Sequence, residues 1–196
     1  MSEHLTPAAA ALQQVTGKQA WAVIRLRDSD TVTLVGGSLA PAERLADIPL
    51  PEGPPEPGRR FDTLVAVPFR QVTERGFEAH DDGAPLAVVR LDTEVEVPLA
   101  DLVAALPEES ITFTDRGGFE TTDQEYAETV GRIIADEIGN GEGANLVVGR
   151  HYRAQLADWG PGTGTAKALT VLRRLLEQER GAYWTYCSSK IGRAHV

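Results

Sequence analysis

The chain has 196 residues, 42% of them hydrophobic, a formal net charge of −10 and a pI near 4.9. This length and hydrophobic content allow a globular domain with a core of its own. The acidic balance argues against general nucleic-acid binding, which needs clustered Lys and Arg to displace counterions from phosphates. No run approaches the roughly 18 apolar residues that span a bilayer, and the start lacks a signal-peptide pattern, so we expect a cytoplasmic protein with no membrane partner.

Strand-like and helix-like segments alternate along the chain, which indicates an α+β fold. Residues 20–26 and 31–35 have the pattern of two short strands, and the polar turn between them could close a hairpin. Residues 50–60 hold four prolines and two glycines, a composition that cannot form a helix. We place a boundary at this linker, between an N-terminal segment, residues 1–60, and a second segment, residues 61–187.

The second segment opens with residues 61–69 and 85–91, which have the pattern of buried strands. A turn sequence, Asp81–Gly83, lies between them. Apolar residues at helical spacing then predict a short helix that ends before Pro107. These apolar residues are Leu99, Leu102, Val103 and Leu106.

A stronger helix is predicted from Thr122, because Thr122 and Glu125 have the spacing of a capping box. One apolar stripe runs along this helix and is expected to face the core. The stripe consists of Tyr126, Val130, Ile133, Ile134 and Ile138. Gly139 is expected to end the helix, and residues 146–148 then have the pattern of a strand.

The last helix is predicted from leucines at 169, 172, 175 and 176 and is expected to end near Gly181. Residues 182–187 follow as a final strand rich in aromatic residues. The single cysteine, Cys187, excludes an intrachain disulfide framework and offers no metal-ligand spacing. We interpret it as a strand residue rather than a reactive thiol.

The glycine-rich turn after the strong helix formally fits a dinucleotide-binding fingerprint through Gly139, Gly141 and Ala144. Its context is reversed, because a nucleotide-binding loop opens a helix, whereas these glycines close one. A helix cap and a tight turn explain Gly139 without any ligand. They do not explain Glu142 and Asn145, and an asparagine at the start of a strand could point into a pocket.

Two blocks carry a family resemblance: residues 136–150, DEIGNGEGANLVVGR, and residues 70–86, RQVTERGFEAHDDGAPL. Together they resemble the chorismate-utilising synthases, in particular the aminating branch with anthranilate synthase component I and the phenazine-type 2-amino-2-deoxyisochorismate synthases. The resemblance runs from about Phe61 to Cys187. The family pattern consists of a glycine, an acidic residue, a glutamine or lysine, an apolar run and an arginine. In this sequence the pattern corresponds to Gly141, Glu142, Asn145, residues 146–148 and Arg150.

The resemblance implies amination of chorismate to 2-amino-2-deoxyisochorismate, or to anthranilate plus pyruvate when pyruvate is eliminated, which makes the enzyme a lyase. Relatives that add water carry a lysine general base at the position of Asn145, and an asparagine cannot take up a proton in this way. Neutral ammonia is already a nucleophile and needs orientation, which an amide oxygen can supply. We therefore expect Asn145 to orient the incoming nucleophile and Glu142 to support the turn.

The same resemblance implies Mg²⁺ held by glutamates in the second half of the synthase domain, which this sequence does not contain. His80, Asp81 and Asp82 could be metal ligands, but adjacent turn residues rarely converge on one ion, so no residue is assigned to a metal.

Ammonia is expected from a glutamine amidotransferase, as a further domain or a separate subunit. The tryptophan-binding Leu-Leu-Glu-Ser motif is missing from residues 1–60. A homodimer is one expectation for the full-length enzyme.

In the family, a sequence like that of residues 183–187 continues into further aromatic residues and a Thr-Gly turn, but here residues 188–196 follow. Residues 191–196 match one reading frame of a sequencing adapter. We interpret residues 188–196 as a non-native tail and the chain as the N-terminal half of a synthase domain, a truncated sandwich of antiparallel sheets with outer helices that is inactive alone. The alternative is a non-catalytic acidic binding module or partner subunit.

Overall fold

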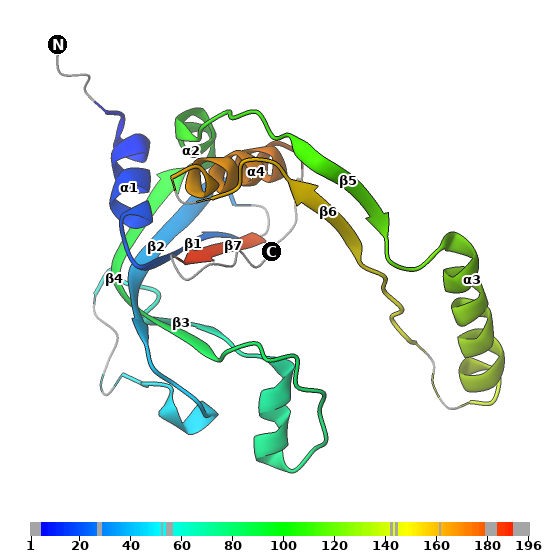
Figure 1. The fold of residues 1–196 in the computed structure, drawn as a ribbon. Helices are drawn as coiled ribbons and strands as arrows, with labels where there is room; N and C mark the ends of the chain where they lie inside the picture. Colours follow the sequence, from blue (N-terminus) through cyan, green and yellow to red (C-terminus); the bar gives the residue numbers. More distant parts are fainter. Residues whose placement is uncertain are drawn as a thin grey trace. The chain divides into compact units, whose positions relative to one another are not determined.

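A computed structural model describes residues 5–26, 29–51, 53, 57–141, 143, 145–160, 162–178 and 184–189. The chain divides into two compact units, which we treat separately. Unit 1 consists of Met1–Glu108 and Ala168–Val196, and unit 2 consists of Glu109–Lys167. Both units combine helices with antiparallel strands, which confirms the predicted α+β fold (Figure 1).

Unit 1 is built on one antiparallel sheet with the strand order β3-β4-β2-β1-β7. Its elements before unit 2 are α1 (Pro7–Thr16), β1 (Ala20–Arg25), β2 (Thr31–Ala40), the 3-10 helix η1 (Leu45–Asp47), β3 (Thr63–Ala66), the 3-10 helix η2 (Phe69–Arg75), β4 (Ala87–Pro98) and α2 (Leu99–Ala105). After unit 2 come α4 (Gly164–Gln178), whose first turn still belongs to unit 2, and β7 (Trp184–Ser189). The hairpin predicted from residues 20–35 is confirmed as β1 and β2, with Ala22 opposite Val35.

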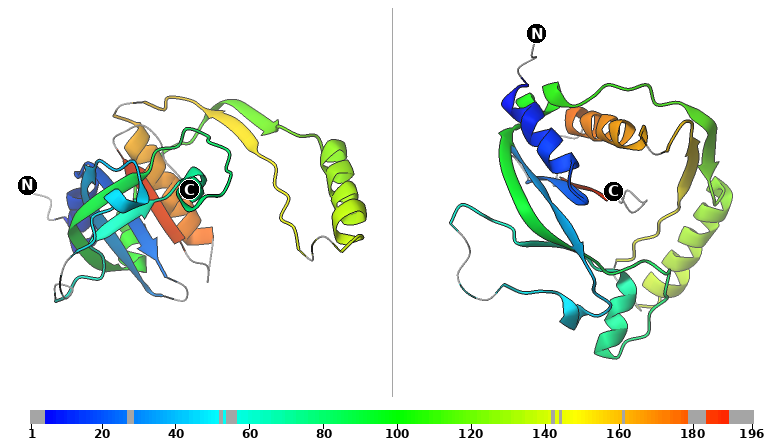
Figure 2. Two further views of the ribbon diagram at one scale, coloured as in Figure 1. Left: turned by 90° about the horizontal axis from the view of Figure 1, so that it is seen from below. Right: turned by 60° about the vertical axis from the view of Figure 1, so that its left-hand side comes forward.

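The main core of unit 1 lies on one face of this sheet, under α1, α2 and α4 (Figure 2). Leu34 of β2, Leu102 of α2 and Leu172 of α4 are fully buried there. Helix α1, which the sequence patterns above did not predict, begins with Pro7 in its first turn and is capped by Thr6, whose Oγ1 accepts a hydrogen bond from Ala9 N at 3.2 Å. Three helices thus shield one sheet face from water.

The opposite sheet face carries a smaller apolar cluster that includes Val35 and Leu91, with Leu64 of β3 packed against it. Because Leu64 pairs with Val89 of β4, the strand beyond the proline-rich linker joins the same sheet as β1 and β2. A β-bulge between β2 and β4 requires Gly37, since a Cβ at Gly37 would lie 1.9 Å from the carbonyl oxygen of Arg90.

Several boundaries in unit 1 differ from the sequence expectation. The strand predicted over residues 61–69 ends at Ala66, because Pro68 lacks a backbone donor and serves as the N-cap of η2. Strand β4 continues to Pro98 instead of ending near Leu91. Helix α2 confirms the predicted short helix, and β7 confirms a final strand, which extends past Cys187 to Ser189. Residues 182 and 183 of the predicted strand lie outside the described residues. Residues 190–196 of the predicted tail lie outside the described residues.

Unit 2 is a two-stranded antiparallel ribbon with a helix inserted between its strands. Its elements are β5 (Phe113–Phe119), α3 (Asp123–Arg132), the π-helix η3 (Ile133–Ile138), β6 (Tyr152–Leu156) and the first turn of α4. The strand predicted at residues 146–148 is wrong, because this segment has no regular secondary structure and the ladder with β5 forms at β6 instead. A strand needs a hydrogen-bonding neighbour, and β5 supplies one only to residues 152–156.

The strong helix of unit 2 begins and ends as the sequence predicts. Thr122 Oγ1 accepts a hydrogen bond from Glu125 N at 3.2 Å, and Glu125 Oε2 accepts one from Thr122 N at 2.9 Å, which confirms the capping box. The helix then widens into η3, where Gly139 N bonds to the Ile134 carbonyl oxygen at 2.8 Å before the helix stops. Within the described part of the chain, no helix combines the length and the apolar character needed to cross a bilayer.

Candidate functional site

Asn145, the residue expected to orient a nucleophile, lies in unit 2 on an irregular segment between η3 and β6. We call residues 145–150 the Asn145 segment. The side chain of Asn145 is exposed, so strand alternation does not aim it at a buried face. Gly141, with φ +80°, supplies the left-handed turn before the segment. Glu142, the second expected site residue, lies outside the described residues.

Arg150 fixes the C-terminal end of the Asn145 segment to the start of α3. Its Nη1 donates to Asp123 Oδ1 at 2.6 Å and to the Thr121 carbonyl oxygen at 3.3 Å. Its guanidinium carbon lies 3.8 Å from the ring centroid of Phe119 and 5.0 Å from that of Tyr126. Only 20% of the Arg150 side chain is exposed, whereas 91% of the Asp123 side chain is, so solvent screens the ion pair while the ring contacts lie in a less open setting.

Tyr126 holds the middle of the same segment. Its hydroxyl group donates a hydrogen bond to the Val148 carbonyl oxygen at 2.9 Å. This bond links α3 to the backbone of the Asn145 segment, which is not part of a β-sheet. The ring of Phe119 meets Tyr152 edge to face, with centroids 5.1 Å apart. We call Phe119, Tyr126, Arg150 and Tyr152 the Arg150 cluster. The cluster substitutes for strand pairing in keeping the Asn145 segment beside α3.

The sequence patterns did not identify this cluster. They placed Tyr126 in an apolar stripe and treated Arg150 only as the end of a motif. Phe119 and Tyr126 are more than 20 residues away from Arg150 in the sequence, so the periodicity of a single helix or strand cannot predict that their rings contact Arg150. The side-chain chemistry does contain a signal, because an arginine that follows an apolar run and a glycine needs a partner if it is to be half-buried.

Hydrogen bonds lower the pKa of three carboxyl groups. Hydrogen bonds from Thr122, first from its backbone N–H and then from its side chain, lower the pKa of Glu125 at the start of α3. In unit 1, Lys18, whose Nζ lies 2.8 Å from Asp92 Oδ1, lowers the pKa of Asp92 together with the Thr93 hydroxyl group. Hydrogen bonds from the backbone N–H groups of Arg44 and then Glu43 lower the pKa of Asp47. All three carboxylates thus act as capping or pairing groups.

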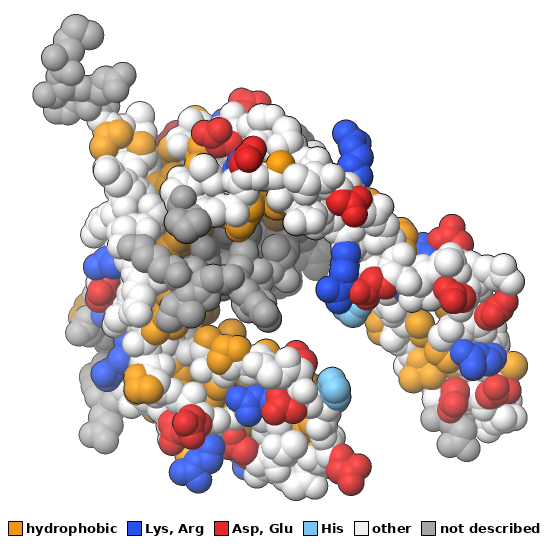
Figure 3. All heavy atoms as spheres, in the orientation of Figure 1, with side chains coloured by type: hydrophobic (Ala, Val, Ile, Leu, Met, Phe, Trp, Pro, Cys, Tyr) orange, Lys and Arg blue, Asp and Glu red, His pale blue; other side chains and the backbone are white. Residues whose placement is uncertain are grey.

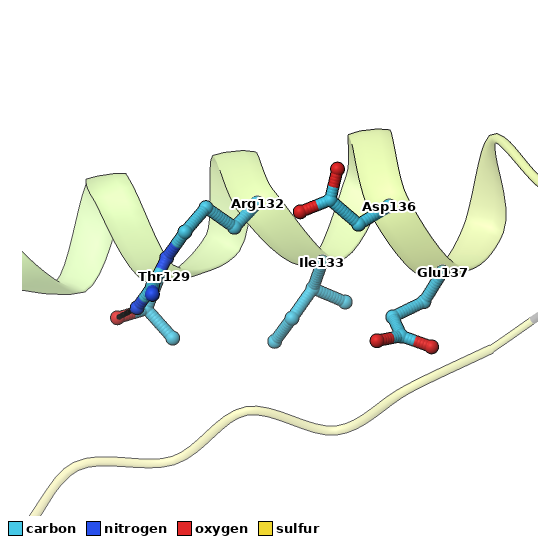
Figure 4. A pocket seen from close by; sticks show the side chains of 5 residues that line it. All are labelled: Thr129, Arg132, Ile133, Asp136 and Glu137. Atoms are coloured by element: carbon cyan, nitrogen blue, oxygen red, sulfur yellow. Dashed lines mark hydrogen bonds between the residues drawn. The ribbon is translucent and has the colours of Figure 1, made fainter.

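A shallow depression of about 220 Å³ lies along α3 and η3 (Figure 4). It is lined by Thr129, Arg132, Ile133, Asp136 and Glu137, all from one continuous helix. Ligand pockets combine convergent groups from several elements and enclose most of the ligand. This depression has one wall, so we assign no ligand to it.

The other family-like block, residues 70–86, lies in unit 1 and forms η2 and a capped loop. Asp81 Oδ1 accepts a hydrogen bond from Gly83 N, and Asp82 Oδ1 accepts one from Ala84 N, both at 2.9 Å. Arg70 Nε lies 3.5 Å from Asp81 Oδ1. The turn interpretation of Asp81–Gly83 is therefore confirmed.

The described residues do not fit a metal ion. Across the ranges that the structure describes, no group of three or more His, Cys, Asp or Glu side chains is arranged to hold one. Divalent magnesium prefers several oxygen ligands in an octahedral arrangement. The carboxylates of Asp81 and Asp82 are instead engaged by backbone N–H groups of their own turn.

Comparison with known proteins tests the family resemblance. No protein-family model matches the chain. A curated protein of Pseudomonas chlororaphis named "Anthranilate synthase, phenazine specific" is 41% identical over 153 residues, which cover 76% of this chain and 23% of the relative. A protein of the same name from Pseudomonas fluorescens is 39% identical over 150 residues, with the same shares. These relatives confirm the resemblance to phenazine-type chorismate-utilising synthases, and the chain spans about a quarter of their length.

Proposed function

We propose that this chain, a homologue of phenazine-specific anthranilate synthases, is part of an enzyme that aminates chorismate. The observation that carries the proposal is the identity of 41% and 39% to two proteins of that name over 76% of the chain. Identity of this extent supports shared ancestry of the matched region. Because the matched region is only 23% of each relative, we propose the activity for a longer polypeptide.

The proposed reaction joins ammonia to the ring carbon next to the carboxylate-bearing carbon of chorismate. The new C–N bond forms as the ring double bonds shift and the bond to the 4-hydroxyl group breaks. The hydroxyl group leaves with one ammonium proton as water, which gives 2-amino-2-deoxyisochorismate. Elimination of pyruvate would carry the product on to anthranilate and would make the enzyme a lyase. The name of the relatives fits either product.

We propose that Asn145 orients the ammonia molecule. Its side-chain oxygen can accept a hydrogen bond from one N–H group and leave the nitrogen lone pair directed at the ring. The exposed position of Asn145 leaves its amide accessible to a substrate, and the Arg150 cluster restrains the backbone that carries it. We propose only a supporting role at the turn for Glu142.

The other components are proposals for the longer enzyme. Mg²⁺ does not fit the described residues, so we propose that its ligands lie outside this sequence and derive no step from it. We propose a glutamine amidotransferase domain or subunit as the ammonia source, a cytoplasmic location and a homodimeric assembly.

Sequencing the source DNA through the codon for Cys187 and beyond tests whether a longer enzyme exists. A frame that continues into a glutamate-containing second half would supply the complete protein for an assay of chorismate consumption with ammonium and Mg²⁺. We expect activity from that protein and none from the 196-residue chain. A frame that ends at Val196 would contradict the proposal for this polypeptide.

Asn145 provides the sharper test in the complete protein. We expect Asn145→Ala to lower the rate of amination about tenfold or more, because the nucleophile loses its orienting group. Asn145→Gln should recover part of the rate. Exposed Asn140, which precedes Gly141, is a matched control, and Asn140→Ala should leave the rate unchanged. An unchanged rate in Asn145→Ala would remove Asn145 from the proposed mechanism.

A further inference from the structure

The described residues of unit 2 form no buried core. Between Glu109 and Ala166, every described residue is exposed or only partly buried. A two-stranded ribbon is marginally stable in water unless a third strand or a helix covers its apolar face. Unit 2 nevertheless contains the longest apolar stripe that the sequence predicts as core. We therefore expect another surface to pack against these apolar residues.

The apolar stripe of α3 and η3 is one part of the surface that unit 2 does not bury by itself. Ile134 is 56% exposed and Ile138 is 39% exposed. Val147, on the Asn145 segment beside α3, is 96% exposed. Hydrophobic side chains gather over this helix and acidic side chains border them (Figure 3). Large apolar patches with a polar rim are typical of interaction sites.

The ribbon adds a second apolar area. Phe113 lies opposite Leu156 and Phe119 lies opposite Tyr152, with two register shifts between these apolar pairs. Phe113 is 45% exposed and Phe119 is 49% exposed. Phe119 stays half-exposed even though Arg150 packs on its ring, so the ribbon, like α3, keeps an apolar area that unit 2 does not bury.

We propose that the apolar surface of unit 2 is the docking surface for the part of the synthase polypeptide that this sequence does not contain. The length of the relatives points to this occupant. Two relatives match this chain over 76% of its residues, but the match covers only 23% of each relative. The remaining length of such a protein is long enough to cover α3 and the ribbon. The inference rests on homology to longer proteins and not on the chemistry of the reaction.

Charge argues against a second copy of the same surface as the occupant. Residues 123–138 contain five acidic side chains and one basic side chain, Arg132. Two copies packed through this helix would bring like charges together around the apolar stripe, and the whole chain carries −10. The surface therefore fits an apolar partner face with a basic rim.

Fragment complementation tests the proposal. The probe is the Pseudomonas chlororaphis relative from which the 153 matched residues have been removed, titrated against the 196-residue chain. We expect a one-to-one complex and slower amide hydrogen exchange over residues 126–138. Ile134→Asp should weaken the complex at least tenfold. Val67→Asp is the matched control, since Val67 is 54% exposed and lies in unit 1, and it should change the affinity less than twofold.

Each alternative outcome has a defined meaning. Absence of a complex with a folded probe, or equal affinities for Ile134→Asp and Val67→Asp, would overturn the docking surface. A dimer of the chain alone that Ile134→Asp dissociates would overturn it in favour of a second copy. A complex that forms as expected but does not consume chorismate would sustain the docking surface and count against the proposed function. Circular dichroism of both variants confirms that each remains folded.

Discussion

Unit 1 and unit 2 bury their apolar residues to different extents. In unit 1, three helices cover a five-stranded sheet, and Leu34, Leu102 and Leu172 are fully buried. In unit 2, a helix and a two-stranded ribbon are held together by the Arg150 cluster, and the large apolar side chains that the structure describes there are exposed or only partly buried. Apolar sequence alone therefore does not make a core, because burial also requires a surface that packs against it.

The largest expected difference between the units is in the effect of truncating an apolar side chain. Leu34→Ala should lower the free energy of unfolding by about 2–5 kcal/mol, because it leaves a cavity in the core of unit 1. Leu146→Ala, at a position 48% exposed, should cost about 0.5 kcal/mol or less. Urea unfolding followed by circular dichroism measures both. Comparable losses would show that unit 2 has a core of its own.

Arg150 should contribute most to the local order of unit 2. Arg150→Ala removes a charge-assisted hydrogen bond and two ring contacts, at a cost of about 1.5–3 kcal/mol. Arg150→Lys should restore only part of this, because an ammonium group cannot reproduce the planar stacking. Hydrogen exchange over residues 145–150 measures the change. Arg153, whose side chain is 78% exposed, is the control, and an equal effect of Arg153→Ala would contradict the role of the cluster.

The two helix caps offer a smaller test of the same contrast. Thr6→Ala and Thr122→Ala each remove a side-chain acceptor at a helix start, worth about 1 kcal/mol. Since α1 packs in the core of unit 1, the loss at Thr6 should lower global stability. The loss at Thr122 should instead appear as faster hydrogen exchange confined to the first turn of α3. Global destabilisation by Thr122→Ala would show that the units unfold as one.

The smallest expected effect is a pH dependence at the start of α3. Hydrogen bonds from Thr122 lower the pKa of Glu125 below its ordinary value of 4.5, so the folded pKa lies below the unfolded one. The stabilisation is therefore present above pH 4.5 and is lost as the pH falls through the folded pKa. Helix content between pH 6 and pH 3, measured by circular dichroism, should fall less in Glu125→Gln. Identical profiles would remove Glu125 as the titrating cap.

The sequence by itself determined the elements whose causes are local. Helical spacing of apolar residues predicts α2, the spacing of Thr122 and Glu125 predicts the start of α3, and a turn between two apolar runs predicts the β1–β2 hairpin. The sequence also supported the family resemblance, because motif residues lie close together in the chain. These signals need no knowledge of distant neighbours.

Tertiary structure alone decided where strand pairing and burial occur. Residues 146–148 have the pattern of a strand, yet β5 pairs with residues 152–156 and the Asn145 segment is held by Tyr126 and Arg150. The stripe of α3 has the pattern of a core, yet Ile134 is 56% exposed. The physical reason is common to both, because a ladder and a core are each made by two surfaces, and a local pattern describes only one of them.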